Sequence, residues 1–165
     1  MNNIILIGMP AVGKSTIGVI LAKELGYMFL DADLIIQQRE RCLLKEILAQ
    51  KGVDGFLQIE NEVNASIEVE RTVIATGGSA VYGREAMEHY KKIGTIVYLS
   101  CRYDLLEKRL GDLRGRGVVM KEGQTLLDIY RERCPLYEKY ADLIIEENEK
   151  NIEETLQLLL KLLNC

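Results

Sequence analysis

The sequence predicts an α/β fold: a three-layer, doubly wound parallel sheet of five strands, with helices on both faces. Short apolar runs alternate with segments of helical periodicity from one end of the chain to the other, which is the pattern of successive β-α units. Residues 4–7 are all apolar, as expected for a strand that is buried on both faces of a parallel sheet. A Gly-rich turn and then a helical pattern follow this run directly. Because no repeat or linker interrupts the alternation, we expect one domain over residues 1–165.

The expected elements follow in order along the chain. Gly26 should end the first helix, and Gly52 and Gly55 should break the long second helical segment. Pro135 should kink or interrupt the helix that contains it. A polar, Arg-rich segment at residues 112–123 contains several Gly residues, so we expect a mobile loop there. The strands are expected at residues 4–7, 28–30, 72–75, 95–99 and 143–145, and the helices at 15–25, 43–70, 84–92, 103–110, 126–140 and from 152 onward.

The composition argues against several classes of protein. The chain has 165 residues, a net charge of −4 and a pI of about 5.2, without a run of Lys or Arg, so neither nucleic acid nor an anionic membrane is expected as its main partner. No apolar run is long enough to cross a bilayer, and the four cysteines form no C-x-x-C pair that would indicate zinc or redox chemistry. With no signal-peptide pattern, we expect a soluble cytoplasmic monomer with reduced thiols.

Residues 8–15 read Gly-Met-Pro-Ala-Val-Gly-Lys-Ser and fit the phosphate-binding pattern G-x-x-x-x-G-K-[ST], between a strand and a helix. The two glycines allow the backbone to curl, so that successive N–H groups and the positive end of the helix dipole face one anion. Lys14 adds a positive charge for the β- and γ-phosphates of ATP, and the Ser15 hydroxyl is a hard ligand for Mg²⁺. The alternative is a chance Gly-rich turn. The predicted nucleotide-binding residues of the loop are Gly8, Ala11, Val12, Gly13, Lys14, Ser15 and Thr16.

Two carboxylates follow the second predicted strand. Asp31 and Asp33 lie at its carboxyl end, which is where doubly wound sheets bind ligands. Because they are two residues apart on what should be extended chain, their side chains are expected to point the same way. One can then hold magnesium while the other reaches an acceptor hydroxyl. Alternatively, Asp33 caps the helical stretch that follows it, and the two roles are compatible.

The kind of phosphate-loop protein is narrowed by what the sequence lacks. A GTPase would need a guanine-reading Asn-Lys-x-Asp, which residues 148–151 do not provide, and a motor or large ATPase would need a longer chain. The single histidine, His89, lies in a predicted solvated helix and is not expected to be catalytic. Because phosphoryl transfer depends on positioning and charge neutralisation, one carboxylate base is enough. These observations favour a kinase that phosphorylates a hydroxyl group of a small molecule.

An ordered set of motifs over nearly the whole chain resembles the shikimate kinases. The resemblance implies a nucleoside-monophosphate-kinase-like fold with strand order 2-3-1-4-5, the use of ATP with Mg²⁺, and a role in aromatic amino acid biosynthesis. It also implies an acceptor-binding helical segment at about residues 33–62 and a lid at about residues 112–123. The matching motifs are the phosphate loop, Leu-Asp-x-Asp at residues 30–33, the segment at 52–60, Gly-Gly at 77–78, the Arg-rich segment, Arg-x-Pro-x-Tyr at 133–137 and Ala-Asp at 141–142.

By position, the resemblance also implies roles for the residues that handle phosphate. Asp31 and Ser15 resemble the magnesium ligands of the family. Asp33 resembles the residue that binds and polarises the acceptor hydroxyl. Arg116 resembles a lid arginine that closes over the transferring phosphate, so the implied catalytic residues are Lys14, Asp33 and Arg116.

Further positions resemble contacts to the adenine base and to the acceptor. Arg109 and Lys150 lie where the family has residues beside the base. Gly77 and Gly78 resemble acceptor-binding backbone, and Arg133 resembles a ligand of the acceptor carboxylate.

The sequence departs from the family pattern on the acceptor side. Leu57 stands where the family has an arginine that shares the carboxylate of shikimate, a charge-assisted contact of about 1.5–3 kcal/mol that Leu cannot make. Ser79 replaces the third Gly of a Gly-Gly-Gly turn, where it either adds a hydroxyl contact or serves turn chemistry. The lid reads Arg-Gly-Val-Val at residues 116–119 instead of Arg-Pro-Leu-Leu, and Gly117 should make it more flexible. Arg114 is either a second lid arginine or a solvated charge.

Three functions are therefore open. The first is a kinase that acts by the shikimate kinase mechanism. The second is a kinase for another polyol, sugar acid or hydroxylated metabolite, which Leu57 favours. The third is a catalytically silent nucleotide-binding regulator. The retention of Asp31, Asp33 and Arg116 argues against this last function, because a binding module has no need of an acceptor-side base or a lid arginine.

Overall fold

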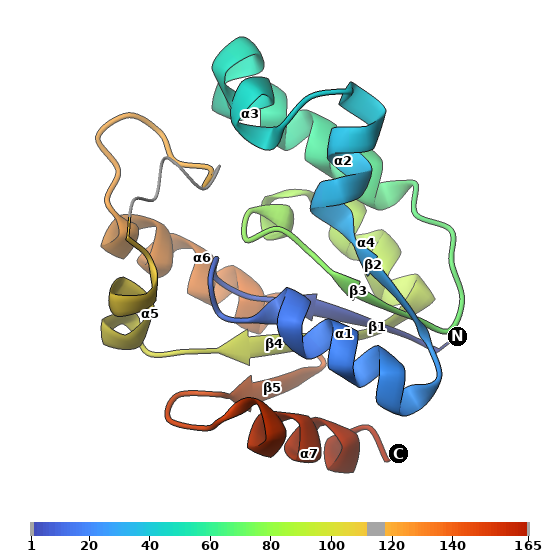
Figure 1. The fold of residues 1–165 in the computed structure, drawn as a ribbon. Helices are drawn as coiled ribbons and strands as arrows, with labels where there is room; N and C mark the ends of the chain where they lie inside the picture. Colours follow the sequence, from blue (N-terminus) through green and yellow to red (C-terminus); the bar gives the residue numbers. More distant parts are fainter. Residues whose placement is uncertain (1, 112–117, 165) are drawn as a thin grey trace.

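A five-stranded parallel sheet forms the centre of the molecule in the computed structural model, which describes residues 2–111 and 118–164 (Figure 1). The strand order is β2-β3-β1-β4-β5, so the expected topology is confirmed. Every neighbouring pair of strands is parallel, and all carboxyl ends therefore lie at one edge of the sheet. The strands are β1 (Asn3–Ile7), β2 (Met28–Asp31), β3 (Thr72–Ala75), β4 (Gly94–Ser100) and β5 (Leu143–Glu146).

Helices cover both faces of this sheet. On the face toward the viewer in Figure 1, α1 (Lys14–Leu25) and α7 (Ile152–Leu162) pack side by side. On the far face, α4 (Arg84–Ile93) and α6 (Leu126–Tyr140) pack on β4, so three layers result, as predicted. The remaining helical elements are α2 (Ala32–Glu40), α3 (Leu44–Ala65), the short 3₁₀ helix η1 (Ala80–Tyr82) and α5 (Tyr103–Arg109).

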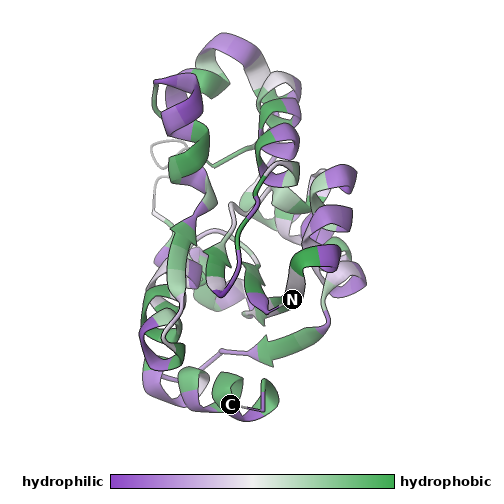
Figure 2. Cartoon of the chain, turned by 90° about the vertical axis from the view of Figure 1, so that its right-hand side faces the viewer, coloured by the Kyte–Doolittle hydropathy of each residue, from purple (hydrophilic) through white to green (hydrophobic). Residues whose placement is uncertain are grey.

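The central strand explains why its sequence is apolar without alternation. All five residues of β1 are buried, because β3 and β4 flank the strand and helices cover both of its faces. Ile5, for example, pairs with Ile74 of β3 and with Ile96 of β4, and all three side chains are fully buried. Figure 2 shows this hydrophobic sheet enclosed by helices whose polar residues face outward. Burial of such side chains stabilises the fold by about 1.5–3 kcal/mol each.

A second, smaller hydrophobic cluster lies outside the sheet, between α2 and α3. Ile36 of α2 meets Ile47 and Phe56 of α3, and Val119 of the segment before α6 completes the cluster. This packing holds the α2–α3 arm, residues 32–65, as a separate layer above the carboxyl edge of the sheet (Figure 1).

The structure corrects several predicted boundaries. The segment expected to be helical over residues 43–70 ends at Ala65, where Ser66 caps it through a hydrogen bond from its hydroxyl to the Val63 carbonyl. The break expected near Gly52 is confirmed, because Gly52 has φ +71° and ψ 179° inside α3, whereas Gly55 remains helical. Pro135 does not interrupt α6.

The helix α6 tolerates Pro135 because its other contacts hold both halves. Thr125 and Asp128 form a capping box at its start, where each side chain accepts a hydrogen bond from the other residue's backbone N–H. The buried positions Ile129 and Tyr137 lie on either side of the proline and pack into the main core.

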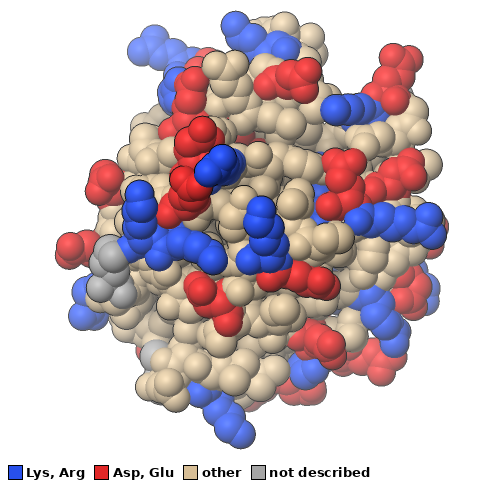
Figure 3. Space-filling model, turned by 180° about the vertical axis from the view of Figure 1, so that it is seen from behind, with Lys and Arg blue, Asp and Glu red and all other residues tan. Residues whose placement is uncertain are grey.

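Surface charges of both signs alternate on the face seen from behind in Figure 3. Exposed pairs such as Arg84 and Glu88, one helical turn apart on α4, contribute little to stability. Among the described residues, no helix is both long and apolar enough to cross a membrane.

Candidate functional site

The loop between β1 and α1 adopts a conformation that its two glycines make possible. Gly8 has φ +149°, and a Cβ at this position would lie 2.7 Å from the Leu99 carbonyl oxygen, so any other residue would clash with backbone. Gly13 has φ +99° and is the N-cap of α1. The loop thereby curls around the N-terminus of α1, where unpaired N–H groups and the helix dipole favour an anion. The predicted phosphate-loop geometry is therefore present.

Lys14 is held inside this loop. Its ammonium Nζ donates to the carbonyl oxygens of Gly8 and Met9, at 2.7 and 2.8 Å, and the residue is only 7% exposed. Burial lowers the pKa of Lys14 to about 8, although the nearby Asp33 carboxylate works in the opposite direction. A positive charge that is this poorly solvated gains strongly from a neighbouring phosphate.

Ser15 and Asp31 lie in contact at the end of the loop. The Ser15 hydroxyl donates to Asp31 Oδ2 at 3.3 Å, while Asp31 Oδ1 accepts from the Asp33 backbone N–H at 2.9 Å. Asp31 is therefore the N-cap of α2, so the alternative in which Asp33 is the cap is wrong. The two aspartates also do not share an extended stretch, because α2 begins at Ala32. Helix formation turns Asp33 toward the sheet edge.

Two hard oxygens thus meet beside the phosphate loop, from a hydroxyl and a carboxylate. Mg²⁺ in phosphoryl-transfer sites usually takes one or two protein oxygens and completes its shell with phosphate and water. Ser15 and Asp31 fit that donor set. Within the described residues, no group of three or more His, Cys, Asp or Glu is arranged to hold a metal alone.

Asp33 lies in the first turn of α2, next to the turn that follows β3. A Cβ on Gly77 would lie 2.8 Å from Asp33 Oδ1, so the carboxylate reaches the backbone there only because residue 77 is Gly. Burial raises the pKa of Asp33 to about 6, the negative charge of Asp31 adds to this, and Lys14 opposes it. A carboxylate with a pKa near 6 is a stronger proton acceptor than an exposed one and is still largely ionised at neutral pH.

A cavity of about 290 Å³ joins these groups. The phosphate loop forms one wall, the turn after β3 forms the floor, and α3 and α6 close the far side. Lys14, Ser15 and Asp33 line it together, as the predicted roles require, and so do Gly77, Gly78 and Arg133. Asp31 contacts the cavity through Ser15. The apolar part of the wall comes from Leu44, Phe56, Leu110, Val118 and Val119.

Arg133 is the most deeply buried charge in the cavity, with 1% of its surface exposed. Its Nε donates to the Tyr82 hydroxyl at 3.3 Å, its Nη2 donates to the Val119 carbonyl oxygen, and the guanidinium lies over the Tyr82 ring. No carboxylate of the described residues forms an ion pair with it, and Nη1 makes no hydrogen bond with them. A buried guanidinium without a counterion favours an anionic ligand group.

Glu60 is a cavity residue to which the sequence reasoning assigned no role. It is 2% exposed on α3, and its Oε1 accepts a hydrogen bond from the Ser79 hydroxyl at 2.7 Å. Ser79 therefore makes a side-chain contact in addition to its place in the turn. The available signal was periodicity, because Phe56, Glu60 and Val63 share one buried face of α3, and a Glu within such a face is unusual.

A second cavity, of about 240 Å³, lies on the other side of the phosphate loop. Ala11, Val12, Gly13 and Thr16 line it, and so do Arg109 and Lys150, which the resemblance assigns to the adenine base. Arg109 forms an ion pair with the buried Glu147, at 2.8 Å between Nη1 and Oε1. Burial raises the pKa of the Glu147 carboxyl, and Arg109 opposes this rise. Sequence reasoning missed Glu147, although it directly follows β5.

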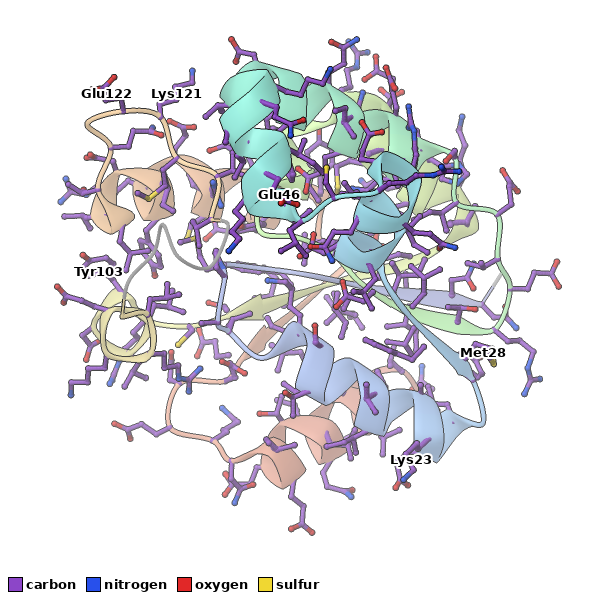
Figure 4. All side chains as sticks on the ribbon, turned by 45° about the horizontal axis from the view of Figure 1, so that its top comes forward. Lys23, Met28, Glu46, Tyr103, Lys121 and Glu122 are labelled. Carbon is purple, nitrogen blue, oxygen red and sulfur yellow. The ribbon has the colours of Figure 1, made fainter. Side chains whose placement is uncertain are left out.

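The predicted lid is only partly within the described residues. Arg114, Arg116 and Gly117 lie outside them, so Arg116 stays a prediction. In the described part, Val118 and Val119 line the cavity, while Figure 4 shows Lys121 and Glu122 pointing away from the body of the protein.

Leu57 is not among the residues that line the cavity. Its side chain packs against the cluster between α2 and α3 and is half-buried. The neighbouring Phe56 lines the cavity instead, so this part of the wall is apolar.

The arrangement as a whole suits transfer of a phosphoryl group to a hydroxyl. A backbone cradle and a lysine can hold phosphates, and a carboxylate lines the same cavity. The buried guanidinium supplies a place for an anionic group of that acceptor.

Comparison with known proteins shows similarity to the shikimate kinases over nearly the whole chain. The family model described as shikimate kinase matches residues 10–164. The chain is 32% identical to shikimate kinase 2 of Yersinia enterocolitica, with 96% of this chain and 95% of that protein covered, and 34% identical to shikimate kinase of Thermodesulfovibrio yellowstonii, with 98% and 94% covered. Among solved structures, shikimate kinase from Acinetobacter baumannii in complex with shikimate superposes with a TM-score of 0.88 at 32% identity, covering 99% of this chain and 93% of that one.

Proposed function

Because the chain belongs to the shikimate kinase family and is an ATP-dependent phosphotransferase acting on a hydroxyl group, we propose that it phosphorylates shikimate in the cavity between the phosphate loop and α6. The observation that carries this proposal is the convergence of Lys14, Asp33 and Arg133 on that one cavity. The phosphate loop would hold ATP, Asp33 the reacting hydroxyl, and Arg133 the acceptor carboxylate.

In the proposed reaction, Asp33 accepts the proton of the acceptor hydroxyl as the hydroxyl oxygen bonds to the γ-phosphorus. The bond between that phosphorus and the bridging oxygen of ADP breaks, and ADP leaves with the electron pair. Lys14 neutralises charge that develops on the phosphate oxygens, and the loop N–H groups keep them in place. The proton on Asp33 then passes to water. Arg116 would add a second positive charge from the lid.

Mg²⁺ is the metal that suits this site, with Ser15 and Asp31 as its protein ligands. When bound, it would neutralise charge on the β- and γ-phosphates of ATP. The nucleotide base would lie in the second cavity, between Arg109 and Lys150.

Two segments serve the acceptor in this proposal. We propose residues 33–62 as the acceptor-binding helical segment and residues 112–123 as the lid. We also expect a monomer as the working unit, located in the cytoplasm, without a nucleic acid or membrane partner. Light scattering after size exclusion tests the monomer directly.

A second candidate function is a kinase for a different hydroxylated metabolite. The specific observation in its favour is that Leu57 packs into an apolar cluster, so Arg133 is the one guanidinium that the described residues bring to the acceptor wall. An acceptor with a smaller or uncharged group at that end would suit such a wall.

The deciding experiment is a panel of hydroxylated acceptors, assayed with ATP and Mg²⁺ through coupled release of ADP. Saturable turnover of shikimate at millimolar or lower KM supports the first function. Turnover of another acceptor with a much higher kcat/KM supports the second. ATP binding without transfer to any acceptor would indicate a silent nucleotide-binding regulator. The Lys14→Met variant, run in parallel, controls for contaminating kinases.

A further inference from the structure

Glu60 and Asp33 approach one point of the backbone from two different helices. A Cβ built on Gly77 would lie 2.9 Å from Glu60 Oε2 and 2.8 Å from Asp33 Oδ1. Both residues line the same cavity. The acceptor-binding wall therefore carries a second carboxyl group beside the one that receives the reacting hydroxyl.

The hydrogen bonds of Glu60 distinguish its two oxygens. Oε1 accepts from the Ser79 hydroxyl, whereas Oε2 makes no hydrogen bond with any described residue. Oε2 instead lies beside Gly77, at the cavity. An acidic proton on this side chain would sit on Oε2, because Oε1 is occupied as an acceptor. The resulting O–H would lie at the cavity, beside Gly77 and the Asp33 carboxylate.

The surroundings of Glu60 favour this neutral form. The groups around it are Ser79 from the turn after β3, Asp33 from α2, Lys14 from the phosphate loop, Arg133 from α6 and Tyr90 from α4. Burial raises the pKa of Glu60 to about 8, with a contribution from Asp33 in the same direction, while Ser79, Arg133 and Lys14 work against it. The carboxyl group is therefore mostly neutral at pH 7.

Two further buried residues near Glu60 have side-chain polar atoms without a hydrogen-bond partner among the described residues. Asn64 lies one helical turn further along α3 and is fully buried, and neither of its amide atoms has a hydrogen-bond partner within the described part of the chain. The same holds for the Tyr90 hydroxyl. These groups supply no cation that could stabilise an ionised Glu60.

We propose that Glu60 and Ser79 form a specificity subsite, in which the Glu60 carboxyl, held by Ser79 through Oε1, donates a hydrogen bond from Oε2 to an uncharged hydroxyl oxygen of the acceptor. The inference rests on the proposed function and refines its substrate class. The acceptor carries an anionic group for Arg133, a reacting hydroxyl for Asp33, and a further hydroxyl for Glu60. An ionised Glu60 would instead repel an anionic acceptor.

Two substitutions distinguish a neutral Glu60, which donates a hydrogen bond, from an ionised Glu60, which cannot. In Glu60→Gln, Oε1 can still accept from Ser79, and the amide N–H₂ replaces the O–H as donor. Glu60→Ala removes both functions. Glu62→Gln is the matched control, because Glu62 lies on the same helix, is exposed and pairs with Arg39 away from the cavity.

Steady-state kinetics with shikimate and ATP, at pH 7 and pH 9, gives the first readout. At pH 7 we expect Glu60→Gln to keep the KM for shikimate within about threefold, and Glu60→Ala to raise it about tenfold, the effect of losing one to two buried hydrogen bonds. The KM for ATP should not change in either variant. From pH 7 to pH 9 the wild-type KM for shikimate should rise as Glu60 ionises, and this rise should be absent in Glu60→Gln and retained in Glu62→Gln. A KM at pH 7 that rises equally in Glu60→Gln and Glu60→Ala would overturn the proposal, as would an equal rise in the KM for ATP.

Infrared difference spectroscopy tests whether Glu60 is protonated, even if shikimate is not the substrate. At pH 7 the carbonyl band of a protonated carboxylic acid should be clearly stronger in the wild type than in Glu60→Gln, and as strong in Glu62→Gln as in the wild type. If wild-type protein does not phosphorylate shikimate but shows this difference, the proposed substrate fails and the neutral subsite stands. A band equally strong in the wild type and in Glu60→Gln at pH 7 would overturn the subsite whatever the kinetics show.

Discussion

The nucleotide side of the site is built mainly from backbone, whereas the acceptor side is built from side chains of several elements. Around the phosphate loop, the features that matter are the conformations of Gly8 and Gly13 and the N-terminus of α1. Around the acceptor, the polar groups of the wall include Asp33 from α2, Glu60 from α3 and Arg133 from α6. A backbone cradle tolerates sequence change outside its glycines, because every residue except proline offers the same N–H. A wall of side chains changes its chemistry with each substitution, and one departure from the family pattern, Ser79, lies in this wall.

Lys14→Met tests the nucleotide side and should have the largest effect. Loss of the only loop side chain placed to neutralise phosphate charge should lower kcat by at least about 10³-fold, since the removal of one preorganised donor from a catalytic site costs about 10²–10³ and Lys14 carries a full charge. The measurement is coupled ADP release with shikimate at saturating ATP. Wild-type kcat in this variant would mean that the loop does not act in catalysis.

Arg133→Lys tests the acceptor side. A lysine keeps the charge but loses the planar guanidinium group, which can bind a carboxylate through two N–H groups. It also loses the contacts to the Tyr82 hydroxyl and the Val119 carbonyl. We expect the KM for shikimate to rise about 10- to 100-fold while the KM for ATP stays within about twofold. Thermal unfolding of the variant should be recorded alongside, because Arg133 is buried. If the two KM values rise together in a folded variant, the two sides are not separable as described.

Leu57→Arg tests whether the acceptor side can be moved toward the family pattern. Position 57 precedes Glu60 by three residues on α3, so a long guanidinium side chain can reach the cavity past that carboxyl. We expect the KM for shikimate to fall about tenfold, with a smaller gain for Leu57→Lys, which cannot make a bidentate contact. No gain from either variant would show that the missing contact belongs elsewhere.

Glu60→Gln tests the acceptor side through the pH dependence of folding stability. The unfolded chain releases the Glu60 proton near its ordinary pKa of 4.5, whereas the folded chain holds it up to about pH 8. The wild type therefore loses stability relative to the variant as the pH rises between these values, by on the order of 1.4 kcal/mol for each pH unit, and the difference then levels off. Urea unfolding of both proteins at several pH values measures this. A constant difference over that range would contradict a neutral, buried Glu60.

What the sequence could predict differs in the same way between the nucleotide side and the acceptor side. The strand order, the phosphate loop and the contact between Ser15 and Asp31 follow from local motifs and from a resemblance over the whole chain. The cap at Asp31 could not be predicted to one residue, because the end of β2 and the start of α2 meet without a linker and no pattern marks the boundary. The continuity of α6 through Pro135 depends on packing at Ile129 and Tyr137, which the local sequence does not show.

The acceptor wall was the least predictable part. Glu60 and Ser79 are 19 residues apart in sequence and meet only after α3 has packed over the turn that follows β3. That Arg133 has no carboxylate partner among the described residues likewise becomes visible only once the neighbouring elements are in place.

Asp33→Asn gives the most direct test of the central claim, that one cavity brings a phosphate loop and an independent acceptor carboxylate together. The amide has nearly the same shape, and the Asp33 backbone N–H that bonds to Asp31 is unchanged. Calorimetry should show ATP affinity within about twofold of the wild type. Single-turnover transfer to shikimate should fall by about 10²- to 10⁴-fold, the range for loss of a general base. Transfer at the wild-type rate, or a collapse of ATP affinity equal to the loss of transfer, would contradict the account.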